Sequence, residues 1–132
     1  MKLEKNQRAE VSHAELQGFV CIDAFCDLVQ RLIDSGIKGK TFHYGGLTKL
    51  TEFEFAKAFA NRFKYDPNLI VPKKHQPRKG ALTEEDIFDF SLNTTRIAQT
   101  LKIKPLLLEE SFDLIEKKLI ATPRPSHIAG HL

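Results

Sequence analysis

The sequence predicts an α/β fold, a small lobe in which short strands alternate with about four helices. Two patterns indicate this fold. Short runs of about five residues that are apolar or alternate between apolar and polar recur along the chain, as expected of strands. Between them, apolar residues recur every three or four positions over longer stretches, which is the spacing of one helix face. The 132 residues, 42% of them hydrophobic, suffice for one ordinary domain.

In the first half, an apolar run predicts a strand at residues 18–22. A helix should follow it, with Asp23 as the N-cap and Gly36 in the left-handed position that ends a helix. Aromatic and β-branched content predicts a second strand at residues 40–44. Thr51 and Glu54 have the spacing of a capping box, so a helix with a stripe of Phe residues should begin there.

The second half predicts a shorter series of elements. These are an edge strand at residues 69–72, a polar loop at 73–87, an alternating strand at 88–92, a short helix from Asn93 or Thr94 to about 101, and a last helix over about 107–120. Residues 1–17 are rich in charge and poor in large apolar side chains, so they are expected to form a leader or a loose helix. Residues 18–121 then make the domain, and residues 122–132 a flexible tail.

Composition bears on the partners and the compartment. The net charge of +3 is mild, and acidic and basic residues alternate, which does not favour a polyanion partner. The N-terminus has no apolar signal region, and no apolar run approaches the roughly 20 residues that cross a bilayer. We therefore expect a cytoplasmic protein without membrane contact, in which Cys21 and Cys26 are reduced, structural thiols.

The residues that could carry chemistry do not form a catalytic set. The chain lacks the glycine-rich phosphate cradles of nucleotide-binding folds, and Gly45-Gly46 is interpreted as a flexible exit from a strand. His43 is expected to be a hydrogen-bonded residue that is buried in the core or half-buried. The three acidic residues at positions 84–86 are expected to be exposed to solvent. No catalytic, cofactor-binding or metal-binding residue is predicted.

One group of residues is a candidate binding site. Positive charge is concentrated at residues 73–79, where Lys74, Arg78 and Lys79 could neutralise a phosphate or diphosphate. A solvated loop without a ligand is the alternative. Nucleic-acid binding is disfavoured because no aromatic residue is interleaved among these charges.

Several runs, taken in order, resemble a known family. They are FVCIDAFCDLV (19–29), GKTFHYGG (39–46), TEFEFA (51–56), DFSLNTTRI (89–97), LKIKP (101–105) and LEESF (108–112). They are similar to the C-terminal part of extended short-chain dehydrogenase/reductases, in particular the dTDP-4-dehydrorhamnose reductase-like group of NAD(P)-dependent sugar-nucleotide reductases and epimerases. The resemblance covers residues 18–120.

The resemblance implies a fold like the C-terminal part of an extended Rossmann-type reductase. It also implies that residues 18–121 are a sugar-nucleotide-binding lobe. The cofactor half of the family, with its glycine-rich turn and Tyr-x-x-x-Lys pair, has no counterpart in the sequence. NAD(P) would therefore be bound only if a separate N-terminal half supplied its site, and the chain alone is expected to be inactive. Whether it is part of an enzyme stays open.

One departure from the family concerns the diphosphate. Where the family places an Arg-Pro pair, this chain has Asp86 and Ile87. Lys74, Arg78 or Lys79 would have to replace that arginine.

Two other functions stay open. The chain could be a non-catalytic regulatory or protein-interaction subunit of the same fold, binding a partner or a second copy through exposed strands at residues 19–22 and 41–44. It could also be a nucleic-acid-binding domain that uses the loop at residues 73–79.

Overall fold

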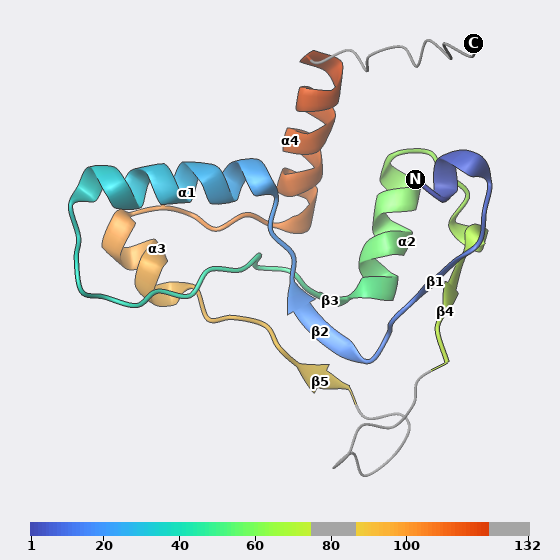
Figure 1. Ribbon diagram of the computed structural model, residues 1–132, viewed down its shortest axis with the longest axis horizontal. Coiled ribbons are helices and arrows are strands. Elements are labelled where there is room, and N and C mark those ends of the chain that lie inside the picture. The colour runs from blue at the N-terminus through green and yellow to red at the C-terminus, as the bar shows by residue number, and fades with distance from the viewer. Residues whose placement is uncertain (75–86, 122–132) are drawn as a thin grey trace, which may run out of the picture.

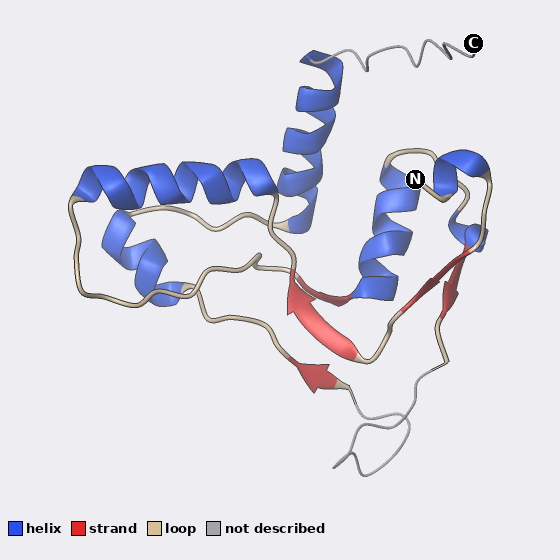
Figure 2. Ribbon diagram, in the orientation of Figure 1, coloured by secondary structure: helices blue, strands red, loops and turns tan. Residues whose placement is uncertain are grey.

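The computed structural model describes residues 1–74 and 87–121. Figures 1 and 2 show its helices and short strands along the chain. The helices are α1 (Ile22–Ser35), α2 (Glu52–Arg62), α3 (Thr95–Leu101) and α4 (Leu108–Ala121), with 3-10 turns η1 (Leu3–Lys5) and η2 (Pro67–Leu69). The strands are β1 (Ala9–Val11), β2 (Glu15–Gly18), β3 (Lys49–Thr51), β4 (Ile70–Pro72) and β5 (Phe88–Asp89). The predicted α/β class with about four helices is confirmed.

The strands form two small sheets within the described residues. β1 pairs with β4 in parallel, with Ala9 opposite Ile70. β2 is the central strand of the other sheet, antiparallel to β3 and parallel to β5. Leu16 lies opposite Thr51 on one side of β2 and opposite Asp89 on the other. This central strand therefore joins segments that are far apart in the sequence.

The prediction of a leader or a loose helix at residues 1–17 is wrong. β1 lies within this segment, and β2 begins in it. These strands contain few apolar residues, so their local signal is weak. Their stability comes from pairing with distant strands and from packing against buried Ile70 and Thr51.

The strand predicted at residues 18–22 lies earlier in the chain, since β2 ends at Gly18. The apolar residues that follow lead into α1, whose N-cap is Cys21 and not Asp23. Asp23 instead lies in the first turn, where a carboxylate interacts favourably with the helix dipole. The predicted end of α1 is confirmed, because Gly36 is in the left-handed conformation.

The strand predicted at residues 40–44 is also absent from the structure, and this stretch is an extended loop. A strand needs a neighbour, and residues 19–22, which could have been that neighbour, lead into α1 instead. Beside these segments, the Gly46 N–H donates to the Gly18 carbonyl at 3.2 Å. A Cβ at Gly46 would lie 2.2 Å from the Phe19 carbonyl oxygen, so Gly46 allows a close backbone approach.

The capping box at the start of α2 is confirmed. The Glu54 N–H donates to the Thr51 hydroxyl, and the Glu54 carboxylate accepts from the Thr51 N–H at 2.8 Å. In the second half, β4 forms at the edge position expected for it, and α3 and α4 lie where helices were predicted. The strand predicted at residues 88–92 is shorter, because β5 is limited to Phe88 and Asp89. The predicted tail lies outside the described residues.

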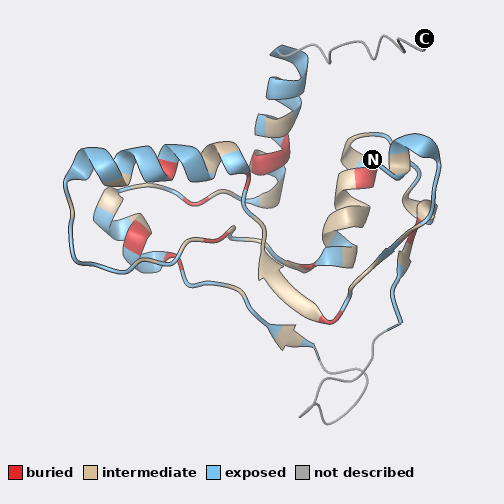
Figure 3. Cartoon of the chain, viewed as in Figure 1, coloured by how far each residue is buried: buried red, intermediate tan, exposed pale blue. Residues whose placement is uncertain are grey.

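The aromatic part of the core lies between α2 and α4. Phe112 of α4 is fully buried and contacts the rings of Phe55, Phe59 and Phe63, which α2 and its C-cap supply, at centroid distances of 5.8–6.0 Å. Figure 3 shows buried segments on both helices, whereas α1 is largely exposed. Burial of aromatic rings is therefore the main stabilising contact between these helices.

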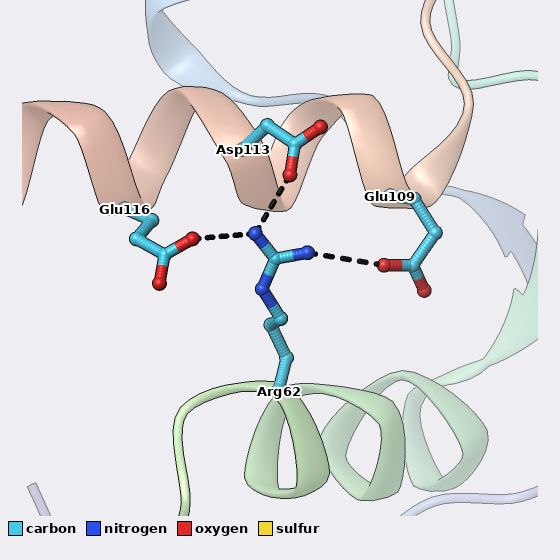
Figure 4. Close-up of polar contacts among 4 residues, drawn as sticks. All are labelled: Arg62, Glu109, Asp113 and Glu116. Atoms are coloured by element: carbon cyan, nitrogen blue, oxygen red, sulfur yellow. Dashed lines mark hydrogen bonds and ion pairs between the residues drawn. The ribbon is translucent and has the colours of Figure 1, made fainter.

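An ion-pair network covers the edge of this core. Arg62, near the end of α2, lies 2.6 Å from Asp113 and 3.4 Å from Glu109, and it also binds Glu116 (Figure 4). The three carboxylates are on α4, and the hydrogen bonds that Arg62 donates to Glu116 and Asp113 raise the pKa of Arg62 above its ordinary value. The network favours one orientation of α4 over others.

Within residues 1–74 and 87–121, no helix is both long and apolar enough to cross a membrane.

Truncation of Phe112 tests the core. We expect Phe112→Ala to lower the free energy of unfolding by about 3–5 kcal/mol, because it removes a fully buried ring and leaves a cavity. Phe112→Leu should cost about 1 kcal/mol. Chemical denaturation monitored by circular dichroism measures both. A loss for Phe112→Ala no larger than that for the exposed control Phe25→Ala would contradict this assignment of the core.

Candidate functional site

The residues predicted to bind a diphosphate are not brought together by the described part of the chain. Lys74 follows β4 and is exposed. Arg78 and Lys79 lie outside the described residues, as do the acidic triplet and Asp86. Lys74 lines neither of the two clefts described below. The binding role of Lys74, Arg78 and Lys79 stays a prediction.

Three other residues singled out in the sequence can be placed. His43 is exposed on the extended loop, so the interpretation of a core or half-buried histidine is wrong. It is exposed because the strand that was to enclose it does not form. Cys21 is buried, Cys26 is exposed on α1, and both are free thiols.

The first cleft has a volume of about 340 Å³ and lies between α1 and the chain that connects α3 to α4. In Figure 1 this connection runs beside α1 before it reaches α4. We name it the cationic cleft. Its lining comprises Ala24, Asp27, Leu28 and Arg31 of α1, Tyr44 of the extended loop, Lys102, Ile103, Lys104 and Leu106 of the connection, and Leu114 of α4.

Three cations and one carboxylate line this cleft. Lys104 is bound to Glu110 at 2.9 Å, so part of its charge is neutralised. Arg31 and Lys102 form no ion pair with any residue in the described ranges. Asp27 is the one acidic residue in the lining. The cleft thus keeps a positive balance that an anion could neutralise.

The backbone at Lys102 is in an uncommon conformation. Lys102 caps α3 with φ of 51°, in the left-handed region, and its N–H donates to the Ala98 carbonyl. Gly or Asn usually occupies such a position. For a residue with a larger side chain, the left-handed conformation costs about 1–2 kcal/mol of conformational free energy. Lys64, which follows the C-cap of α2, has the same conformation with φ of 61°. The conformation of Lys102 is therefore one that this chain uses to end helices, and its place in the cleft is what makes its charge available to a ligand.

Tyr44 adds a neutral hydrogen-bond donor. Its side chain is half-buried, and burial, together with the nearby Cys21 thiol, raises the pKa of its hydroxyl above the ordinary value of 10.0. The hydroxyl therefore stays protonated at neutral pH and can donate to an oxygen of a ligand. Leu28, Ile103, Leu106 and Leu114 give the lining apolar surface beside these polar groups.

The second cleft, of about 500 Å³, lies at the end of the central sheet. We name it the polar cleft. It is lined by Gly46, Leu47, Lys49, Asp89 and residues 91–95. Asp89 accepts from Lys49 at 3.2 Å and from the N–H of Ser91 at 2.8 Å, and it also accepts from the Ser91 hydroxyl. The Asn93 side-chain oxygen accepts from the N–H of Thr95 at 2.9 Å.

These internal bonds engage Lys49, Asp89 and Ser91 of the polar cleft. Hydrogen bonds from Ser91, with a further one from Lys49, lower the pKa of Asp89 from 3.8 to about 2. A carboxylate held ionised in this way is a poor proton donor at neutral pH. The cationic cleft, whose Arg31 and Lys102 form no ion pair in the described residues, is therefore the stronger candidate for binding a ligand.

The groups that line the cationic cleft can recognise a ligand. Its lining contains no Ser, Cys or His that could act as a nucleophile or a base near neutral pH. In the described residues, no group of three or more His, Cys, Asp or Glu side chains could hold a metal ion. Its cations, its phenol and its apolar surface suit a ligand with an anionic group and an apolar or ring-shaped part.

Comparison with protein-family models and with curated proteins finds no match to this chain.

Sequence reasoning missed Arg31, Lys102 and Lys104. Arg31 lies within the first predicted helix, and Lys102 and Lys104 lie in the turn between the last two predicted helices. The alternation of lysine and isoleucine at residues 102–104 was a weak signal for these cations. Nothing in the sequence placed this turn beside α1, since their proximity depends on the tertiary packing of α3 and α4.

The ionisation of Asp89 gives a pH-dependent prediction. Its folded pKa lies below its ordinary value, so its stabilising contribution is present above about pH 4 and is lost as the pH falls towards 2. We expect Ser91→Ala to raise the pKa of Asp89 towards 3.8, because the largest contribution to the shift is removed. A carbon-13 NMR titration of the carboxyl group measures it. Thr95→Val, in the same cleft, should leave the pKa unchanged, and an unchanged value in Ser91→Ala would refute the assignment.

Proposed function

We propose that this chain is a binding module for a phosphorylated sugar or a nucleotide sugar, and that its ligand lies in the cationic cleft. The observation that carries the proposal is the convergence of Arg31, Lys102 and Lys104 on one cleft that contains a single acidic residue. The resemblance to sugar-nucleotide reductases and epimerases supports the choice of ligand class. Catalysis and binding of NAD(P) would need residues beyond those of this cleft.

The three cations differ in what they can contribute. The planar guanidinium of Arg31 can donate two parallel hydrogen bonds to a phosphate, whereas Lys102 offers a mobile point charge. Lys104, already paired with Glu110, would contribute less. Arg31 and Lys102 are thus proposed as the main contacts to the phosphate or diphosphate.

The neutral groups of the cleft suit the rest of such a ligand. Tyr44 can donate a hydrogen bond to a sugar hydroxyl or a phosphate oxygen, and the apolar side chains can cover one face of a ring. A volume of about 340 Å³ lies at the lower end of the range of small-molecule sites. We therefore expect the cleft to hold the phosphates and one ring, while the other end of a nucleotide sugar extends into solvent.

Isothermal titration calorimetry with dTDP and with UDP-glucose tests the proposal. Both should bind, whereas glucose should not, because the cations recognise the phosphates. Arg31→Gln and Lys102→Gln should each raise the Kd roughly five- to ten-fold, since each removes a charge-assisted contact that is partly exposed to solvent. Added salt should weaken binding to the unaltered chain.

Lys74→Gln is the matched control. It removes one exposed positive charge outside the cationic cleft, so binding should stay unchanged. If Lys74→Gln weakens binding while Arg31→Gln does not, the ligand lies at the basic loop and the proposed site is wrong. Absence of binding by dTDP and UDP-glucose at millimolar concentration would reject the proposed function.

A further inference from the structure

Lys104, one of the three cations of the cationic cleft, is held by a carboxylate that does not itself line the cleft. Its ammonium group lies 2.9 Å from Oε1 of Glu110, which is in the first turn of α4. The other carboxylate oxygen of Glu110, Oε2, accepts a hydrogen bond from the N–H of Leu107 at 2.7 Å. Glu110 therefore has two separate partners, and of these Lys104 lines the cleft.

The bond from Leu107 fixes Glu110 independently of Lys104. Leu107 directly precedes α4, and its side chain has no oxygen that could cap the helix, so the carboxylate of Glu110 satisfies a backbone N–H at this end of α4. The hydrogen bonds from Leu107 and Lys104 lower the pKa of Glu110 below its ordinary value, and the bond from Leu107 contributes more. The carboxylate therefore keeps its position, and at neutral pH its charge, when Lys104 turns away.

The side chain of Lys104 can move while the backbone around it stays in place. This side chain is 69% exposed, so little packing holds it. The N–H of Ile103 donates to the Ala98 carbonyl at 3.0 Å. On the other side of Lys104, the carbonyl of Leu106 accepts from the N–H of Leu47 at 3.0 Å. The flexible stem of the lysine can thus redirect its ammonium group without a change in the lining of the cleft.

A ligand phosphate and Glu110 compete for this ammonium group. An ion pair between exposed side chains is weak, because water and salt screen it, so an anion of higher charge can displace the carboxylate. We propose that Glu110 is an internal competitor of the ligand, which binds Lys104 when no ligand is present and releases it to the phosphate. The inference rests on the proposed function and adds to it a control on the affinity of the same site.

Calorimetric titration with dTDP tests the inference on variants of this pair. We expect Glu110→Gln to bind dTDP roughly two- to five-fold more tightly than the unaltered chain, because the ligand no longer has to displace a carboxylate from Lys104. Glutamine can still accept from the N–H of Leu107, so the cap of α4 is kept. In a Lys104→Gln background, Glu110→Gln should change the Kd little, since its effect depends on Lys104.

Glu109→Gln is the matched control. It removes one carboxylate from the same turn of α4, but Glu109 is paired with Arg62 and not with Lys104, so the affinity for dTDP should stay unchanged. Far-UV circular dichroism checks that each variant is folded. A carbon-13 NMR titration of Lys104→Gln without ligand should give a Glu110 pKa that is still below its ordinary value, because the bond from Leu107 remains. A pKa restored to the ordinary value would overturn the inference.

The results with dTDP distinguish this inference from the proposed function. If dTDP binds and Glu110→Gln leaves the Kd unchanged or raises it, Glu110 does not compete with the ligand and the inference is wrong, whereas the proposed function stands. Equal tightening by Glu109→Gln, or by Glu110→Gln in the Lys104→Gln background, would also overturn the inference, because the effect would then be one of overall charge. If neither the unaltered chain nor Glu110→Gln binds dTDP at millimolar concentration, the proposed function fails and the inference fails with it.

Discussion

The packing of Phe112 between α2 and α4 is the contact on which the rest of the structure depends. The ring is fully buried against three Phe residues that α2 and its C-cap supply. Once α4 is held there, its Lys118 reaches Asp23 at the start of α1, and the N–H of Leu108 donates to the Thr48 hydroxyl at 3.0 Å. The position of α4 thereby sets the path of the connection that lines the cationic cleft.

Local signals predicted the helices well. The capping box at Thr51, the glycine that ends α1, and the helical stripes of α2 and α4 each depend on residues within a few positions of one another, so the sequence is sufficient to show them. The strands were predicted poorly because each depends on a distant partner. β2 contains charged and polar residues and is nevertheless the central strand, whereas residues 40–44 have strand-like composition but no neighbouring strand.

The candidate site shows the same limit. Sequence reasoning selected Lys74, Arg78 and Lys79 because they are close together in the chain. The cationic cleft instead combines Arg31 of α1 with Lys102 and Lys104, far away in the sequence, and their proximity follows from the packing of α1 on α3 and of the connection beside it. The left-handed backbone at Lys102 could not be predicted either, because a lysine gives no local signal for that conformation.

The inner face of α1 is therefore proposed to contact a phosphorylated ligand. Lys102 is the cleft residue at which backbone conformation and charge can be tested separately. The most direct measurement is the affinity of Lys102→Gly for dTDP together with its Tm. Glycine accepts the left-handed conformation, so we expect weaker binding and a Tm that is unchanged or higher. Unchanged affinity with a lowered Tm would show that Lys102 serves stability, and it would contradict the proposed site.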